Sequence, residues 1–144
     1  MDESIVRNWG TPDSLKDLNL RYSFEDVGQD GMQFKLKNEE NLEVFYMDFF
    51  IRTRENRAFS NNNFGKHLVL QAIKTETNYR KMGIATFFIT KLCGYCEEIG
   101  IQTIVITVAP PSRDEFNMLK TEELVDFYNS FTTDEVKIVI DDII

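Results

Sequence analysis

The 144-residue chain predicts an α/β fold with a mixed central sheet, antiparallel in its first part and parallel around one strand–helix–strand unit. Two observations lead to this class. Short runs of alternating apolar residues, separated by turn residues, fill the first third of the chain, as is typical of antiparallel strands. An apolar run, a helical stripe and a second apolar run then follow one another between residues 67 and 109. Parallel strands need a long crossover connection, so this order predicts a βαβ unit.

The N-terminal part is expected to form short strands joined by tight turns. Ser14 is expected to cap a short helical turn. Alternation in residues 20–24 predicts the first strand, the glycine-containing residues 28–31 predict a turn, and residues 32–37 alternate again.

Residues 42–54 predict a long strand that is apolar on both faces, and such a strand belongs inside a sheet. Asp48 interrupts it, and three interpretations stay open: a bulge, a buried acid with satisfied hydrogen bonds, or a carboxylate that grips an amine. The polar residues 54–66 are expected to form a loop that borders a binding site.

The centre of the chain predicts a buried strand, a polar connection and an amphipathic helix. Residues 67–75 are rich in apolar and β-branched side chains, residues 76–82 are polar, and Gly100 is placed to end the helix. Apolar side chains recur at helical spacing over residues 84–99, and the expected stripe consists of Ile84, Phe87, Phe88, Leu92, Tyr95, Cys96 and Ile99.

A tight basic turn between a strand and a helix makes a site for an anion. The first N–H groups of a helix have no intrahelical partner, and the helix dipole adds partial positive charge there. Arg80 and Lys81 add full charges, and Gly83 allows a ligand to approach the backbone closely.

The last third of the chain predicts a strand, a helix and a final strand. Residues 102–109 are short, β-branched and apolar, and two prolines follow them. Thr121 is placed to cap a helix with Leu124, Phe127, Tyr128 and Phe131 on its apolar stripe. Residues 136–140 predict a last strand, whose open edge would allow a homodimer. No linker or repeat divides the sequence, so residues 1–144 are expected to form one domain.

The net charge of −8 argues against nucleic acid as a partner, because phosphates would be repelled. It suits a cationic substrate such as an amine, although it also simply promotes solubility. No apolar run is long enough to span a bilayer and the first residues have no signal-peptide character, so no membrane partner and a cytoplasmic location are expected.

The two cysteines form a Cys93-Gly-Tyr-Cys96 pair near the end of the expected helix. Redox pairs usually place the first cysteine at a helix N-terminus, where its thiolate is stabilised. Two reduced, packed thiols are the alternative. With only one histidine in the chain, no metal site is expected.

The run from Arg80 to Ala85 has the form [QR]-x-x-G-x-[GA] and resembles the acetyl-CoA motif of the GNAT superfamily of N-acetyltransferases. The family's usual run is close to V-x-P-x-Y-R-G-K-G-I-G. Thr77 stands in place of the proline, Lys81 and Met82 in place of Gly-Lys, and Ala85 in place of the last glycine. A Phe127-Tyr128 pair also matches, whereas the family's Gly-Phe turn, its two helices between the first strands and its full final hairpin are not evident, so the chain looks like a trimmed member.

The resemblance implies a GNAT-like fold whose parallel βαβ core binds acetyl-CoA as cosubstrate, and an N-acetyltransferase that moves the acetyl group to a primary amine by direct attack. By position, the pyrophosphate would bind the turn and the pantetheine would pair with the strand, through Ile73, Lys74, Thr75, Arg80, Lys81, Met82, Gly83, Ile84 and Ala85. The alternative is a non-catalytic GNAT-like module that binds CoA or a protein partner.

Two catalytic residues are implied by the resemblance. His67 occupies the strand position of the catalytic glutamate in the histone-acetylating branch, so it is a candidate base for the amine proton. Tyr128 matches the family's tyrosine that protonates the departing CoA thiolate. A strand-end histidine that only forms a hydrogen bond and a tyrosine that only packs in the core are the respective alternatives.

Overall fold

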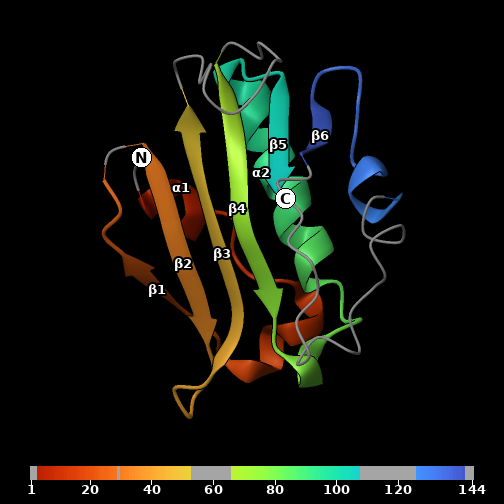
Figure 1. The fold of residues 1–144 in the computed structure, drawn as a ribbon. Coiled ribbons are helices and arrows are strands. Elements are labelled where there is room, and N and C mark those ends of the chain that lie inside the picture. Colours follow the sequence, from red (N-terminus) through yellow and green to blue (C-terminus); the bar gives the residue numbers. More distant parts are fainter. Residues whose placement is uncertain (1–2, 29, 53–65, 108–125, 142–144) are drawn as a thin grey trace.

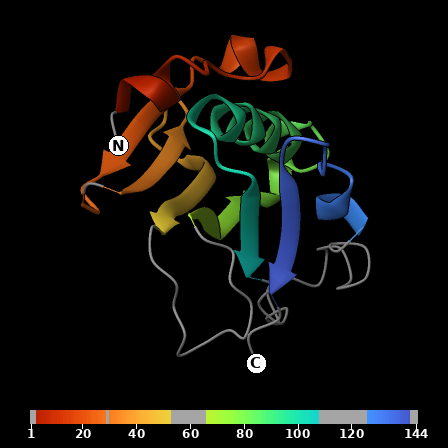
Figure 2. The same ribbon diagram turned by 90° about the horizontal axis from the view of Figure 1, so that it is seen from above.

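The structure is a computed structural model that describes residues 3–28, 30–52, 66–107 and 126–141. Its centre is a six-stranded sheet in the order β1-β2-β3-β4-β5-β6, and the helices α1 and α2 lie against one face of this sheet (Figures 1 and 2). The elements are α1 (Glu3–Arg7), η1 (Asp13–Leu18), β1 (Arg21–Glu25), β2 (Gly31–Lys37), β3 (Glu43–Arg52), β4 (His67–Thr75), η2 (Thr77–Tyr79), α2 (Ile84–Ile99), β5 (Thr103–Thr107) and β6 (Lys137–Asp141).

The first half of the sheet is antiparallel, as the sequence predicts. Strands β1 to β4 pair with their neighbours in antiparallel register. Burial alternates along β2, where Met32, Phe34 and Leu36 face the core. Strand β3 lies between β2 and β4, which confirms the interior position expected for an apolar strand.

The second half of the sheet is parallel. Strand β4 pairs with β5 in parallel register through the α2 crossover, so the predicted βαβ unit is confirmed. Strand β6 is parallel to β5 and is the last strand in the sheet order. Helix α2 ends at Gly100, whose φ of 79° lies in the left-handed region that glycine adopts without strain.

Helix α2 is held on the sheet mainly by aromatic packing. The Phe88 ring stacks on Phe45 of β3 at 4.8 Å between ring centroids and contacts Phe34 of β2 at 5.4 Å. The predicted stripe is wrong at Ile99, which is 37% exposed although Cys96 in the same turn is fully buried. Ile89 and Cys93, which the stripe omitted, are buried instead.

The N-terminal residues pack beneath the same face and were not predicted beyond one helical turn. Val6 of α1 and Leu15 of η1 are buried, and Trp9 stacks near Phe49 of β3 at 6.3 Å. The expected capping role of Ser14 is wrong: η1 has no side-chain cap, and the Ser14 hydroxyl donates to the carbonyl of Met82 at 2.9 Å. Both elements precede β1, and residues 26–30 alone connect β1 to β2.

Two sequence predictions fall largely outside the described residues: the polar loop at 54–66, of which Lys66 is described, and the beginning of the helix expected after residue 121. Residues 126–129 of that helix are helical and lie beside β6 in both views (Figures 1 and 2). Within the described ranges, no helix is long and apolar enough to cross a membrane.

Candidate functional site

The connection between β4 and α2, residues 76–83, is called the basic turn here. Its first half is a single 3-10 turn, which Glu76 caps by accepting a hydrogen bond from the Asn78 backbone N–H at 2.9 Å. The backbone then turns sharply, with Lys81 at φ 66° and Gly83 at φ 79°. Because glycine adopts such angles at no steric cost and lysine does not, the turn holds Lys81 in a strained conformation.

The N-terminus of α2 is open at the end of the basic turn. Gly83 is the N-cap residue, no side chain caps the helix, and Phe87 is the residue whose N–H donates to the Gly83 carbonyl, at 2.9 Å. A β-carbon built on Gly83 would meet no atom within 4 Å. Among the described residues, the helix N-terminus therefore has no side-chain cap, and it has open space at Gly83 and the charge of Lys81 nearby, as an anion site requires.

Among the described residues, two side-chain hydrogen bonds hold the basic turn against the rest of the protein, besides a backbone bond from the Glu76 N–H to the Val44 carbonyl at 2.9 Å. The Arg80 side chain folds back, so that its Nε donates to the Thr75 carbonyl at 3.2 Å. The Ser14 hydroxyl of η1 donates to the Met82 carbonyl. The second contact spans 68 residues of sequence, and no local pattern could have revealed it.

Strand β4 has a free edge just before the basic turn. Its pairs with β5 end at Leu70 and Ile106, yet β4 continues to Thr75. In the described part of the chain, residues 72–75 therefore pair with β3 alone. Their edge facing β5 offers backbone groups to an extended ligand, and this stretch contains Ile73, Lys74 and Thr75 of the predicted binding set.

Strand β4 has a bulge directly after its last described pair with β5. Asp48 pairs with Ala72 and Phe49 pairs with Leu70, so Gln71 has no register partner on β3. An extra residue of this kind bends its strand. One of the three interpretations of Asp48 is thereby refined: a bulge is present, but the extra residue lies opposite Asp48 on β4.

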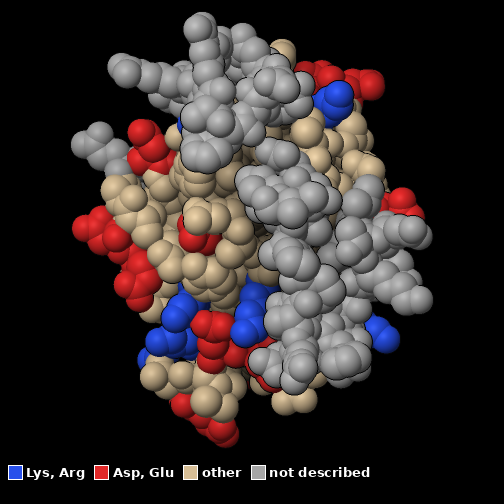
Figure 3. All heavy atoms as spheres, in the orientation of Figure 1, with Lys and Arg blue, Asp and Glu red and all other residues tan. Residues whose placement is uncertain are grey.

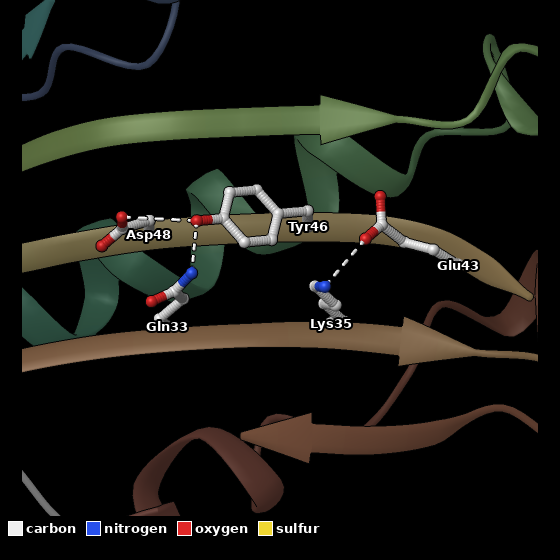
Figure 4. A network of polar contacts seen from close by, with 5 residues as sticks. All are labelled: Gln33, Lys35, Glu43, Tyr46 and Asp48. Atoms are coloured by element: carbon white, nitrogen blue, oxygen red, sulfur yellow. Dashed lines mark hydrogen bonds and ion pairs between the residues drawn. The ribbon is translucent and has the colours of Figure 1, made fainter. Parts of the chain in front are cut away.

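A cavity of about 410 Å³ opens beside the bulge, and its lining residue Asp48 projects from the face of the sheet away from α2 (Figure 4). We call it the Asp48 cavity; it is lined by Val27, Asp30, Gly31, Asp48, Phe49, Phe50 and Gln71. On this face, uncharged surface surrounds a small acidic patch over the middle strands, and basic and acidic side chains lie side by side toward the lower end of the view (Figure 3).

A short polar chain leads to the Asp48 carboxylate (Figure 4). The Gln33 amide donates to the Tyr46 hydroxyl at 2.7 Å, and that hydroxyl donates to Asp48 Oδ2 at a long 3.4 Å. Desolvation raises the pKa of Asp48 above its usual range, and the hydrogen bond from Tyr46 acts in the opposite direction. The pKa of Tyr46 is also raised, by desolvation and then by the nearby Asp48 charge.

The comparison with solved structures concerns the whole chain. The aminoglycoside N-acetyltransferase AAC(6')-Iy in complex with CoA matches with a TM-score of 0.53 at 14% identity, over 100% of this chain and 96% of that chain. The aminoglycoside 6'-N-acetyltransferase AAC(6')-Ih from Acinetobacter baumannii matches with a TM-score of 0.51 at 13% identity, over 100% of this chain and 94% of that chain. No family model and no curated protein matches the sequence.

Both structures are GNAT acetyltransferases, and both match this chain along almost their whole length. The chain has the GNAT fold. The identities are low, so the likeness concerns the arrangement of the backbone. The resemblance inferred from six residues at the basic turn is therefore confirmed for the fold, including the mixed sheet and the βαβ core.

His67 and Tyr128 occupy separate parts of this GNAT fold. His67 is the first residue of β4, at the end of the strand away from the basic turn, and is 7% exposed. A strand rises about 3.3 Å per residue, which places His67 roughly 13 Å from the bulge at Gln71. Its role as a base stays a prediction.

Tyr128 lies in the helical residues beside β6 and is 7% exposed, next to the Phe127 ring at 5.4 Å. Burial raises its pKa to about 12, so the hydroxyl keeps its proton at neutral pH. A proton donor must begin in that state, although the raised pKa makes it a weaker acid. Its role also stays a prediction.

The two cysteines of helix α2 are buried thiols with raised pKa values. Cys93 and Cys96 are free and buried. Burial, followed by the charge of Glu97, raises the pKa of Cys93 to about 11, and burial raises that of Cys96 to about 12. A redox cysteine needs a stabilised thiolate, so the redox interpretation loses its chemical basis.

Proposed function

We propose that this protein transfers an acetyl group from acetyl-CoA to a primary amine. The observation that carries the proposal is the continuous site formed by the free edge of β4, the basic turn and the open N-terminus of α2. An extended arm ending in a pyrophosphate needs these features in this order. The GNAT fold supports the proposal, since the solved structures that share it bear the name of N-acetyltransferases.

In the proposed complex, the pyrophosphate binds the basic turn and the first turn of α2, beside Arg80, Lys81, Met82, Gly83, Ile84 and Ala85. The pantetheine arm runs back along the free edge at Ile73, Lys74 and Thr75. Because β4 leads from the bulge to the basic turn, the thioester at the far end of this arm lies toward Gln71.

The reaction needs no covalent intermediate on the protein. The ammonium first loses one proton to a base, for which we propose either His67, reached through a chain of water molecules, or water itself. The neutral nitrogen attacks the thioester carbonyl, a C–N bond forms and the C–S bond breaks. The departing CoA thiolate takes a proton from Tyr128, so the products are an N-acetyl amine and free CoA thiol.

A non-catalytic module that binds CoA is the second candidate. Residues 26–30 alone connect β1 to β2, and β6 pairs directly with β5. The resemblance places two helices at the first position and a hairpin after the last helix, and acceptor contacts come from such added elements. The short connection between β1 and β2 in this chain, where the resemblance would place two helices, favours binding without turnover.

Heating the protein with and without acetyl-CoA tests both candidates together. Saturating ligand at about one hundred times its Kd stabilises the folded state by about 2.7 kcal/mol. We expect a clear rise in Tm, and no rise would contradict both candidates. Lys81→Ala is the binding control, because it removes a charge from the basic turn without touching the sheet.

Release of free CoA thiol in the presence of an amine panel separates the candidates. Transfer predicts thiol release that depends on the amine and falls strongly in Tyr128→Phe, which keeps the ring in the core. Binding of acetyl-CoA with no amine-dependent thiol release would instead establish the non-catalytic module. The double variant Cys93→Ser with Cys96→Ser should retain the activity if the thiols only pack.

The last strand also supports a proposed homodimer. Strand β6 is at the end of the sheet order, and an unpaired strand edge favours pairing with a second copy. Sedimentation of the protein at micromolar concentration should then give twice the mass of the chain, and a mass of one chain would exclude this pairing.

A further inference from the structure

The Asp48 cavity lies where the proposed acyl arm ends. Gln71 belongs to both features, since it lines the cavity and directly follows Leu70, the last residue of β4 with a described pair on β5. Asp48 pairs with Ala72, the residue next to Gln71, so its carboxylate is closer to this point than His67 is. A molecule in the cavity would therefore meet the reactive end of the arm.

The lining of the cavity is acidic and apolar. Among the described lining residues it includes two carboxylates, Asp30 and Asp48, and no lysine or arginine; Arg52 lies over the Phe50 ring, with its Cζ 5.3 Å from the ring centroid. Val27 at 42% exposure and Phe50 supply the apolar part, whereas the Phe49 ring is fully buried near Trp9. Such a lining attracts a positive charge and excludes a second negative one. The charge of −8 on the whole chain acts in the same direction.

The Tyr46 hydroxyl orients the Asp48 carboxylate, but this hydrogen bond is long and leaves the carboxylate able to accept a stronger one. Tyr46, which Gln33 holds in place, reaches Oδ2 only at 3.4 Å. Hydrogen bonds between an ammonium and a carboxylate are shorter, at about 2.8 Å, and roughly twice as strong as neutral ones. An ammonium entering the cavity would thus gain a contact that Tyr46 does not provide. Burial of the carboxylate, which raises its pKa, makes this gain larger.

The space in the cavity depends on a glycine. A β-carbon on Gly31 would lie 3.0 Å from Val27 Cγ2 and 3.7 Å from the Phe49 carbonyl. The segment before Gly31 is fixed to β3, because Ile51 donates its backbone N–H to the Asp30 carbonyl at 2.8 Å. The cavity is therefore built on paired backbone, and one methyl group would narrow it.

We infer that the Asp48 cavity is the acceptor site, and that Asp48 binds a primary ammonium carried on an uncharged, apolar stem without a neighbouring carboxylate. This inference rests on the proposed acetyl transfer, to which it adds the residue that receives the acceptor and the charge pattern that the acceptor must have. Tyr46 and Gln33 act as positioning residues for the carboxylate.

Three probes with the same ring test the inference: 2-phenylethylamine, its neutral analogue 2-phenylethanol, and L-phenylalanine, which adds a carboxylate. Each is titrated into the full chain with saturating CoA at pH 7, and the backbone amide signals of Gly31 and Gln71 are followed by NMR. We expect the amine to shift both signals with at least about tenfold tighter binding than the alcohol or the amino acid, as loss of a charged hydrogen bond implies.

Three variants complete the test. Asp48→Asn should lower the affinity for the amine to that for the alcohol, while Glu43→Gln, five positions earlier on β3 and paired with Lys35, should leave it unchanged. Gly31→Ala should weaken the binding of the amine and of the alcohol to the same extent. Shifts confined to other parts of the protein, no binding of the amine, or equal amine affinity in Asp48→Asn and the parent would each overturn the inference.

Thiol release distinguishes this failure from failure of the proposed function. If acetyl-CoA is consumed with an unchanged KM for the amine in Asp48→Asn, the acceptor site lies elsewhere although acetyl transfer stands. If the amine binds the cavity through Asp48 and thiol is never released, the ammonium site stands and acetyl transfer does not.

Discussion

The basic turn and the Asp48 cavity lie at the two ends of one stretch of β4, yet they are built in opposite ways. The basic turn is continuous in sequence, and its proposed role depends on the φ angles of residues 76–83 and on the first backbone N–H groups of α2. The cavity collects side chains from the segment before β2, from β3 and from β4. The contrast shows that a backbone site is encoded locally, whereas a side-chain site depends on strand register.

Helix α2 connects the two regions, because it begins at the basic turn and packs beneath β2 and β3. Phe88→Ala removes the ring that stacks on Phe45 and should cost about 3–5 kcal/mol of unfolding free energy. Denaturation with urea measures this loss. Phe87→Ala, at a half-buried neighbouring position, should cost clearly less. Equal losses would mean that α2 is not anchored through the Phe88 face.

The backbone of the basic turn is tested by replacing its glycine. Gly83→Ala places a β-carbon on a residue with φ 79° and should cost about 1–2 kcal/mol, with weaker CoA binding by calorimetry. Gly94 lies within α2 and is exposed, so Gly94→Ala should instead stabilise the protein by up to about 1 kcal/mol. If both substitutions change the unfolding free energy in the same direction, the positive φ of Gly83 does not affect stability.

Lys81 separates charge from backbone strain in the same turn. Lys81→Gly relieves the strain of φ 66° and, after the entropy cost of glycine, should stabilise the fold by about 1 kcal/mol. Lys81→Ala keeps the strain and should not stabilise it. Both variants lose the same charge, so both should weaken CoA binding similarly. The resemblance places glycine at this position, which these φ values explain.

The smallest effect is expected at the cavity. Burial raises the pKa of Asp48 above its ordinary value of 3.8, so the folded protein binds this proton more tightly than the unfolded chain does. The unfolding free energy therefore falls as pH rises from 3.8 through the raised pKa, and the loss persists at neutral pH. The hydrogen bond from the Tyr46 hydroxyl reduces this penalty.

Asp48→Asn removes the penalty and should be slightly more stable than the parent at pH 7 but not at pH 3. Thermal unfolding at the two pH values measures the difference, with Glu43→Gln as the control. A gain in stability together with the loss of amine affinity would mark Asp48 as a residue kept for binding. An equal difference at both pH values would exclude titration of Asp48 as the cause.

The sequence alone determined the elements whose signals are local. Strand β4, helix α2 and the stop at Gly100 follow from periodicity and from the conformational freedom of glycine, and the basic turn follows from a six-residue motif. The crossover rule then required β5 to be parallel to β4. These features depend on interactions between residues close in the chain, so the local sequence pattern is sufficient to predict them.

Only the tertiary structure decided the rest. The bulge at Gln71 is a change of register between β3 and β4, and no residue type in the sequence predicts such a change. The same register brings Asp48 beside the end of the free edge, and folding of η1 onto the turn brings Ser14 to Met82. The basic turn could be located from the sequence because it is one contiguous segment. The lining of the Asp48 cavity could not be predicted, because it comes from distant segments that only packing brings together.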